Sequence, residues 1–204
     1  MTLRLATRGS PLALWQAEAV AAALRRDDPA LEVRLVEVKT EGDRVVDRPI
    51  AEVGVQGAFT VEVDQAVRDG RADAAVHSLK DLATTPTPGL ALAATLPRGS
   101  AEDALLAPRF GAFERLPPEA VVATGSPRRR AQLRRLRPDL RFVDVRGNIA
   151  TRLARLDSGA CDAMVLARAG LERLGLAARI SETFSFERVL PAAGQALVGV
   201  TCRA

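Results

Sequence analysis

The sequence of 204 residues contains very few aromatic residues. Tyrosine is absent, tryptophan occurs once, and aromatic residues make up 3% of the chain. This scarcity argues against a protein that binds nucleic acid by stacking bases on aromatic side chains. Hydrophobic residues nevertheless make up 48% of the chain, so the core must be built from alanine, leucine and valine.

Cysteine is equally scarce and occurs only at Cys161 and Cys202. Two cysteines provide neither a disulfide framework nor a metal-ligand spacing, and we expect both to be core thiols. The sequence begins without a long apolar signal region, and no apolar run reaches the length of a membrane span. We therefore expect a cytoplasmic protein with no metal site and no membrane partner.

Arginine carries nearly all of the positive charge. The net charge is +4, and of the 29 basic residues only Lys39 and Lys80 are lysines. Arginine suits bidentate recognition of carboxylates and phosphates, which favours a polyanionic ligand. A nucleic-acid partner is disfavoured because the basic residues, apart from a cluster at 128–135, do not form one continuous stripe.

The order of the predicted elements indicates an α/β fold. Hydrophobic periodicity and turn residues predict helices at 12–26, 59–69, 128–137, 149–156 and 167–174. Strands are predicted at 3–7, 32–38, 73–78, 90–94, 121–124, 141–145 and 163–166, with a return strand from 189–191 and 197–202. Residues 44–58 lack a clean period, which predicts a mobile loop.

The opening of the chain is echoed in its second half. Ala6-Thr7-Arg8-Gly9-Ser10-Pro11 resembles Ala123-Thr124-Gly125-Ser126-Pro127-Arg128, and in both copies a strand leads through a small polar turn into a proline-started helix. The echo is either a chance similarity of two turns or the sign of two similar α/β domains. We favour two domains, 1–96 plus 191–204 and 97–190, that face each other across a ligand cleft.

Candidate ligand-binding residues follow from the rule that open α/β sheets bind ligands at the carboxyl ends of their strands. The predicted strand ends and helix starts carry Thr7, Arg8, Ser10, Lys80, Asp81, Thr124, Ser126, Arg128, Arg129, Arg146 and Arg152. This basic set would bind several carboxylates or phosphates, while Asp81 could handle a proton or stabilise a cation.

Two of these assignments have structural alternatives. Lys80 and Asp81 could form a solvated ion pair at a helix start, with Ser78 as the N-cap. His77 could act as a general base, although a single histidine at the end of a buried strand is more often a core residue.

Four sequence motifs stand out along the chain. They are residues 4–16 (RLATRGSPLALWQ), residues 75–81 (AVHSLKD), Arg146-Gly147-Asn148 with Thr151-Arg152-Leu153, and Leu190-Pro191-Ala192 with Gly194-Gln195. Together these motifs resemble those of the hydroxymethylbilane synthase family, also called porphobilinogen deaminase. The resemblance implies two similar domains of the type II periplasmic-binding-protein kind with a ligand cleft between them.

The resemblance also implies a transferase of tetrapyrrole and haem biosynthesis. Such an enzyme joins four porphobilinogen molecules head to tail into hydroxymethylbilane with loss of ammonia, and acts as a monomer on porphobilinogen and the growing oligopyrrole. By the match Asp81 is the catalytic carboxylate, and residues 44–58 form the active-site loop. The residues implied to bind cofactor and substrate are Arg8, Ser10, Lys80, Asp81, Thr124, Ser126, Arg128, Arg129, Arg146, Arg152 and Arg173.

Two departures from the family pattern leave a second hypothesis open. Family members carry a third α+β domain, whose cysteine holds the dipyrromethane cofactor by a thioether, and this sequence ends before it. Relatives also commonly place lysines at the positions of Gln56 and Val61 in the loop region. The alternative to a transferase is therefore a non-catalytic, polycarboxylate-binding module of two domains.

Overall fold

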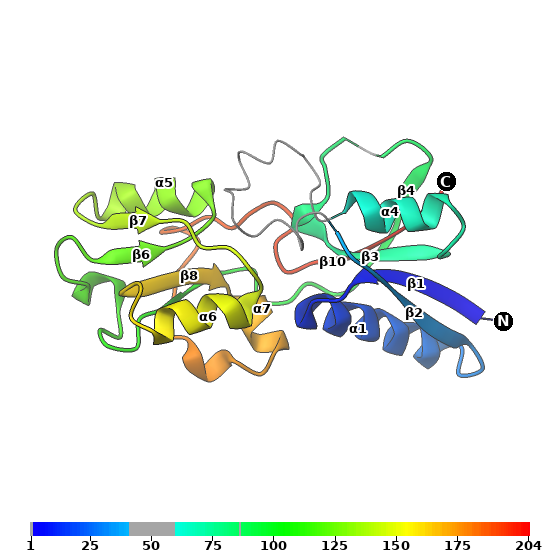
Figure 1. The fold of residues 1–204 in the computed structure, drawn as a ribbon, viewed down its shortest axis with the longest axis horizontal. Helices are drawn as coiled ribbons and strands as arrows, with labels where there is room; N and C mark the ends of the chain where they lie inside the picture. Colours follow the sequence, from blue (N-terminus) through cyan, green and yellow to red (C-terminus); the bar gives the residue numbers. More distant parts are fainter. Residues whose placement is uncertain (1, 41–59, 86) are drawn as a thin grey trace. The chain divides into compact units, whose positions relative to one another are not determined.

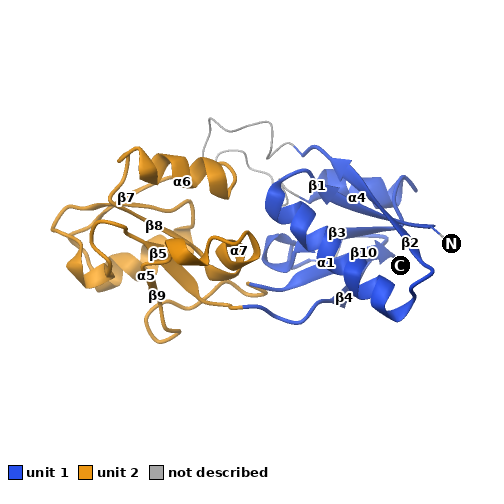
Figure 2. Cartoon of the chain, turned by 90° about the horizontal axis from the view of Figure 1, so that it is seen from below, with its two compact units in different colours: residues 1–48, 53–99, 196–204 blue, residues 49–52, 100–195 orange. Residues whose placement is uncertain are grey.

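The computed structural model describes residues 2–40, 60–85 and 87–204 (Figure 1). The predicted mobile loop at 44–58 lies outside the described residues. The described chain forms two compact units (Figure 2). Unit 1 contains the residues up to Gly99 together with Ala196–Ala204, and unit 2 contains Ser100–Gln195.

The core of unit 1 is a five-stranded mixed sheet with the strand order β2-β1-β3-β10-β4. β1 runs parallel to β2 and β3, whereas β10 is antiparallel to β3 and β4. The strands are β1 Thr2–Arg8, β2 Glu32–Val38, β3 Ala74–Ser78, β4 Leu90–Thr95 and β10 Val198–Arg203.

The helices α1, Pro11–Asp27, and α4, Val61–Arg68, cover opposite faces of this sheet (Figure 1). Successive residues of a strand point to opposite faces, so Leu5 of β1 packs with α1 while Ala6 packs with α4. A 3-10 turn, η1, follows β3 at Leu79–Asp81.

Unit 2 has the same kind of sheet, with the strand order β7-β6-β8-β5-β9. β6 runs parallel to β7 and β8, and β5 is antiparallel to β8 and β9. The strands are β5 Asp103–Leu106, β6 Val121–Ala123, β7 Arg141–Val143, β8 Ala163–Ala167 and β9 Glu182–Thr183.

Hydrophobic clusters cover both faces of the unit 2 sheet. One cluster contains Phe113, Leu133 and Phe184, whose two aromatic rings meet edge to face with centroids 5.4 Å apart. The other contains Leu153 and Met164. The helical elements are η2 Phe113–Arg115, α5 Pro127–Leu136, α6 Ile149–Asp157, α7 Arg168–Arg173 and η3 Ala177–Arg179.

The two sheets correspond strand for strand. In each, the first strand of the repeated motif (β1 or β6) is an inner strand, the second (β2 or β7) forms the edge beside it, and an antiparallel strand from a distant part of the chain follows the third (β3 or β8). The prediction of two similar α/β units is therefore confirmed. A chance similarity of two turns does not account for this shared topology.

Most predicted elements are present, but three details differ. β5 and β9 are only four and two residues long and were not predicted from the sequence. The prediction that residues 189–191 belong to the return strand is wrong, because only Val198–Arg203 pairs with β3 and β4. Ser78 precedes η1 without making a side-chain cap bond.

The packing of α5 on the sheet of unit 2 can be tested at Leu133, which is fully buried. Leu133→Ala should lower the free energy of unfolding by about 2–5 kcal/mol, because it removes buried contacts and leaves a cavity. Leu190→Ala, at a side chain that is 63% exposed, is the matched control and should change it little. Urea unfolding followed by circular dichroism measures both, and equal losses would contradict the packing described here.

Candidate functional site

The carboxyl ends of the parallel strands place four of the predicted residues at one edge of the unit 1 sheet. Arg8 ends β1 and Ser10 begins α1, whereas Lys80 and Asp81 lie in η1 directly after β3. Asp81 is exposed. Because β1 and β3 run parallel, these residues share an edge of the sheet.

Local hydrogen bonds fix this edge of unit 1. The Ser10 hydroxyl accepts a bond of 3.3 Å from the backbone N–H of Ala13 and so caps α1. The Gln16 amide donates to the hydroxyl of Ser78 at 2.9 Å and so ties α1 to the end of β3. Thr7 is fully buried and donates to the carbonyl of Ala13 at 3.1 Å, so its side chain is occupied within the fold.

His77 is buried and belongs to a polar cluster inside unit 1. Its Nε2 lies 3.0 Å from Oδ1 of Asp64 on α4, and the hydroxyl of Thr201 on β10 donates to the same oxygen at 3.2 Å. All three residues are at most 7% exposed. His77 is therefore a core residue with partners, as the structural alternative proposed. Asp64 and Thr201 were not identified from the sequence.

The corresponding edge of unit 2 carries Thr124 and Ser126 after β6, and Arg146 after β7. The Ser126 hydroxyl accepts from the N–H of Arg129 at 3.4 Å and caps α5. A side chain at Gly125 would place its Cβ 2.8 Å from the carbonyl oxygen of Val145, so this close approach of two turns requires glycine. The second copy of the motif thus has a helix start like the first, with backbone N–H groups suited to an anion.

Asp103, which the sequence did not identify, lies at the same edge because β5 runs antiparallel to β8. Its carboxylate is fully buried and accepts bonds of 2.7 Å from Arg128 and 2.7 Å from Arg129. Burial alone would raise the pKa of Asp103, but the guanidinium groups of Arg129 and Arg128 outweigh it and hold the pKa below its ordinary value. Two predicted ligand residues are thus bound to an internal acid.

The other basic residues predicted in unit 2 have different surroundings. Arg152 donates from Nε to the carbonyl of Gly147 at 2.9 Å. Burial lowers the pKa of the Arg173 guanidinium, and neighbouring Glu172 opposes this effect. Arg146 has a buried Nη1 without a hydrogen-bond partner among the described residues. A buried nitrogen of this kind is costly unless it meets an acceptor, so Arg146 is suited to receive an anion.

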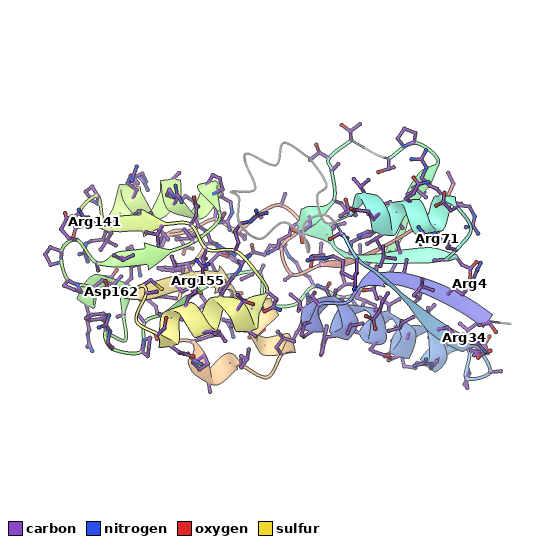
Figure 3. All side chains as sticks on the ribbon, viewed as in Figure 1. Arg4, Arg34, Arg71, Arg141, Arg155 and Asp162 are labelled. Atoms are coloured by element: carbon purple, nitrogen blue, oxygen red, sulfur yellow. The ribbon has the colours of Figure 1, made fainter. Side chains whose placement is uncertain are left out.

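Arginines also lie at the opposite edge of the unit 1 sheet, where the strands begin. Arg4, Arg34 and Arg71 lie near the amino ends of the strands (Figure 3). Each has an acidic partner close to it in the fold, such as Asp73, which lies 2.7 Å from Arg4. Arginine content alone therefore does not mark a site, and the position at the carboxyl edge is the distinguishing feature.

Neither cysteine has the surroundings of a reactive thiol. Cys161 is buried, and burial, followed by the charge of Asp162, raises the pKa of its thiol. Cys202 lies in β10 and packs against the core of unit 1. Within the described ranges, no group of three potential metal ligands occurs and no helix is suited to cross a membrane.

Comparison with known proteins gives a family match along the chain. A family model described as "Porphobilinogen deaminase, dipyromethane cofactor binding domain" matches residues 3–204. The porphobilinogen deaminases of Xanthomonas euvesicatoria pv. vesicatoria and Xanthomonas campestris pv. campestris strain B100 are each 52% identical over 202 residues. The alignments cover 99% of this chain and 66% of each relative, so the chain spans about two thirds of their length.

Solved structures show the likeness in fold. An ABC transporter periplasmic substrate-binding protein from Coxiella burnetii has a TM-score of 0.58 and 16% identity, covering 98% of this chain and 84% of its own. A nutrient-binding protein from Burkholderia cenocepacia bound to methionine has a TM-score of 0.58 and 15% identity, covering 99% of this chain and 85% of its own. At such low identity these structures support the fold alone.

The buried carboxylate of Asp103 leads to a prediction about how the free energy of unfolding depends on pH. Because the folded pKa of Asp103 lies below its ordinary value of 3.8, its contribution to stability is complete above that value and is lost as the pH falls through the lower, folded pKa. The difference in free energy of unfolding between the native protein and Asp103→Asn should be constant above about pH 5 and shrink below about pH 4.

Urea unfolding between pH 6 and pH 2.5 measures this difference. Asp144→Asn, which removes the acid of the Arg130–Asp144 pair at a partly exposed position, is the control. A difference that stays constant down to the lowest pH would show that the pKa of Asp103 is the same in the folded and unfolded protein, which would contradict the effect of the two guanidinium groups.

Proposed function

Because this chain belongs to the porphobilinogen deaminase family, we propose that it forms the part of a hydroxymethylbilane synthase that binds the dipyrromethane cofactor and the substrate and carries the catalytic carboxylate. The observation that supports this most directly is the position of the predicted residues. In each unit they gather at the carboxyl edge of the sheet, together with a serine-capped helix start.

The donor groups at these edges suit the ligand that the family implies. Porphobilinogen carries acetate and propionate side chains, and arginine binds carboxylates by paired, charge-assisted bonds. Arg146 supplies a buried Nη1 that has no acceptor among the described residues. Dipyrromethane, when bound, supplies the primer to which substrate units are added. Arg128, Arg146 and Arg152 of unit 2 would bind the carboxylates of dipyrromethane. Arg8 and Lys80 would provide the basic groups of unit 1.

Asp81 is the residue proposed to assist the chemistry. When porphobilinogen reacts, its carbon–nitrogen bond breaks, ammonia leaves and a positively charged pyrrole forms. A carboxyl group at this position can donate a proton to the departing amino group, and the resulting carboxylate stabilises the cation. Asp81 follows β3 directly and is exposed, which leaves it accessible to a ligand at this edge.

A non-catalytic binding module is the second candidate. The observation that favours it is that Cys161 is buried and Cys202 packs against the core of unit 1, so neither thiol is placed to anchor a cofactor. Such a module would bind the oligopyrrole carboxylates at the same edges but would not release ammonia.

Asp81→Asn tests the catalytic role. In protein loaded with dipyrromethane, the variant should release ammonia from porphobilinogen at least a hundred-fold more slowly, because proton transfer by a positioned acid typically contributes about 10²–10⁴-fold. Its melting temperature should stay near that of the native protein. Asp69→Asn, at another acid of unit 1, is the control.

Ammonia release and dipyrromethane binding together separate the two candidates. An unchanged rate in Asp81→Asn would remove this residue from its role. Dipyrromethane binding without ammonia release by the native chain would instead support the binding module.

The binding of ligand carboxylates can be tested by replacing Arg146 and Arg152. Replacing both by leucine should weaken dipyrromethane binding at least ten-fold, because hydrogen bonds to charged groups contribute about 1.5–3 kcal/mol each. Arg141→Leu removes an exposed arginine that pairs with Glu119 and should leave the affinity unchanged. Isothermal titration calorimetry measures the affinities, and equal values for the native protein and the double variant would refute the assignment.

A further inference from the structure

We propose that Asp103 is a positioning residue that orients Arg128 for a ligand carboxylate, a role that rests on the function proposed above. Asp103 is the first residue of β5, and its carboxylate is fully buried beneath the start of α5. The carboxylate is not accessible to solvent, so it would not contact a ligand directly. It acts on a ligand only through the arginines that it holds.

Three donors converge on the carboxylate of Asp103. Arg128 Nη2 lies 2.7 Å from Oδ2, and Arg129 Nη2 lies 2.7 Å from Oδ1. The Gln195 amide donates to Oδ1 at 2.8 Å and also to the carbonyl of Ala101 at 2.6 Å. These bonds fix the carboxylate and the backbone that leads into β5, so the acid itself has little freedom to move.

The two arginines have different exposure and therefore different roles. The side chain of Arg129 is only 8% exposed, and its Nη1 donates to the carbonyl of Val165. Arg129 thus compensates the charge of Asp103 inside the unit. The side chain of Arg128 is 26% exposed, so its guanidinium is shared between Asp103 and the surface. The three groups together leave one positive charge at the amino end of α5, where the helix dipole also favours an anion.

A second contact holds the guanidinium of Arg128 from another direction. Its Nη1 donates to the carbonyl of Leu190. That backbone is fixed in turn by Gln132, which accepts from the N–H of Leu190 at 2.8 Å and donates to its carbonyl at 3.1 Å. Arg128 is therefore held at both terminal nitrogens before any ligand arrives, which reduces the entropy lost on binding.

The variant Asp103→Asn with Arg129→Met removes one negative and one positive charge together. Arg129→Met alone is the reference, because Arg129 is itself a predicted binding residue. If Asp103 only neutralises Arg129, adding Asp103→Asn to Arg129→Met should leave the dissociation constant for dipyrromethane unchanged or lower it. If Asp103 orients Arg128, we expect the dissociation constant for dipyrromethane to rise at least ten-fold while the melting temperature changes little. Asp144→Asn, which breaks another arginine pair of α5, is the control.

A second measurement needs no ligand. Phenylglyoxal modifies accessible arginines, and mass spectrometry reports its rate of reaction at each site. Arg128 should react several-fold more slowly than the exposed Arg135 in the native protein, and should approach the rate of Arg135 in the charge-balanced variant. Equal rates at Arg128 and Arg135 in the native protein would overturn the proposal, even if the variant failed to fold.

These readouts separate the positioning role from the proposed function. A dipyrromethane affinity no weaker than that of Arg129→Met, with unchanged Arg128 reactivity, in the charge-balanced variant would overturn the positioning role alone. Absence of dipyrromethane binding by the native protein would overturn the proposed function, and Arg128 reactivity would then decide whether Asp103 still orients the arginine.

Discussion

Parallel strand pairing is the constraint on which the candidate site depends. In each unit one inner strand, β1 or β6, pairs in parallel with both neighbours, so the carboxyl ends of three strands share one edge of the sheet. α1 follows β1 and α5 follows β6 after a short turn, and both helices present backbone N–H groups at that edge. An edge suited to an anion therefore arises twice in the molecule, from backbone geometry before any arginine is considered.

The same constraint explains which features could be predicted from the sequence. The two proline-started helices were predicted because a helix start is a local feature, decided by a few neighbouring residues such as Ser10-Pro11 and Ser126-Pro127. Asp103 was missed because its importance depends on an antiparallel strand inserted beside β8, and its arginine partners are 25 and 26 residues away in the chain. The contact between Asp64 and His77 was not predicted either, because it joins α4 to β3 only in the folded unit.

The burial of the acid partner distinguishes the arginines at the two edges of the sheets. Arg4 and Arg34 pair with acids that remain accessible to water, and such pairs contribute little to stability. Arg129 pairs with an acid that water does not reach, where loss of one partner leaves an uncompensated charge. The cluster around Asp103 therefore links the stability of unit 2 to the arrangement of its ligand-facing groups.

The placement of β10 has a consequence for the order of folding during synthesis. Among the described residues unit 2 is continuous in the sequence, whereas the sheet of unit 1 receives β10 between β3 and β4 from a segment more than a hundred residues later. On the ribosome, all of unit 2 emerges before β4 can gain its neighbour and before Thr201 can reach Asp64. The sheet of unit 1 can therefore be completed only after unit 2 has been synthesised.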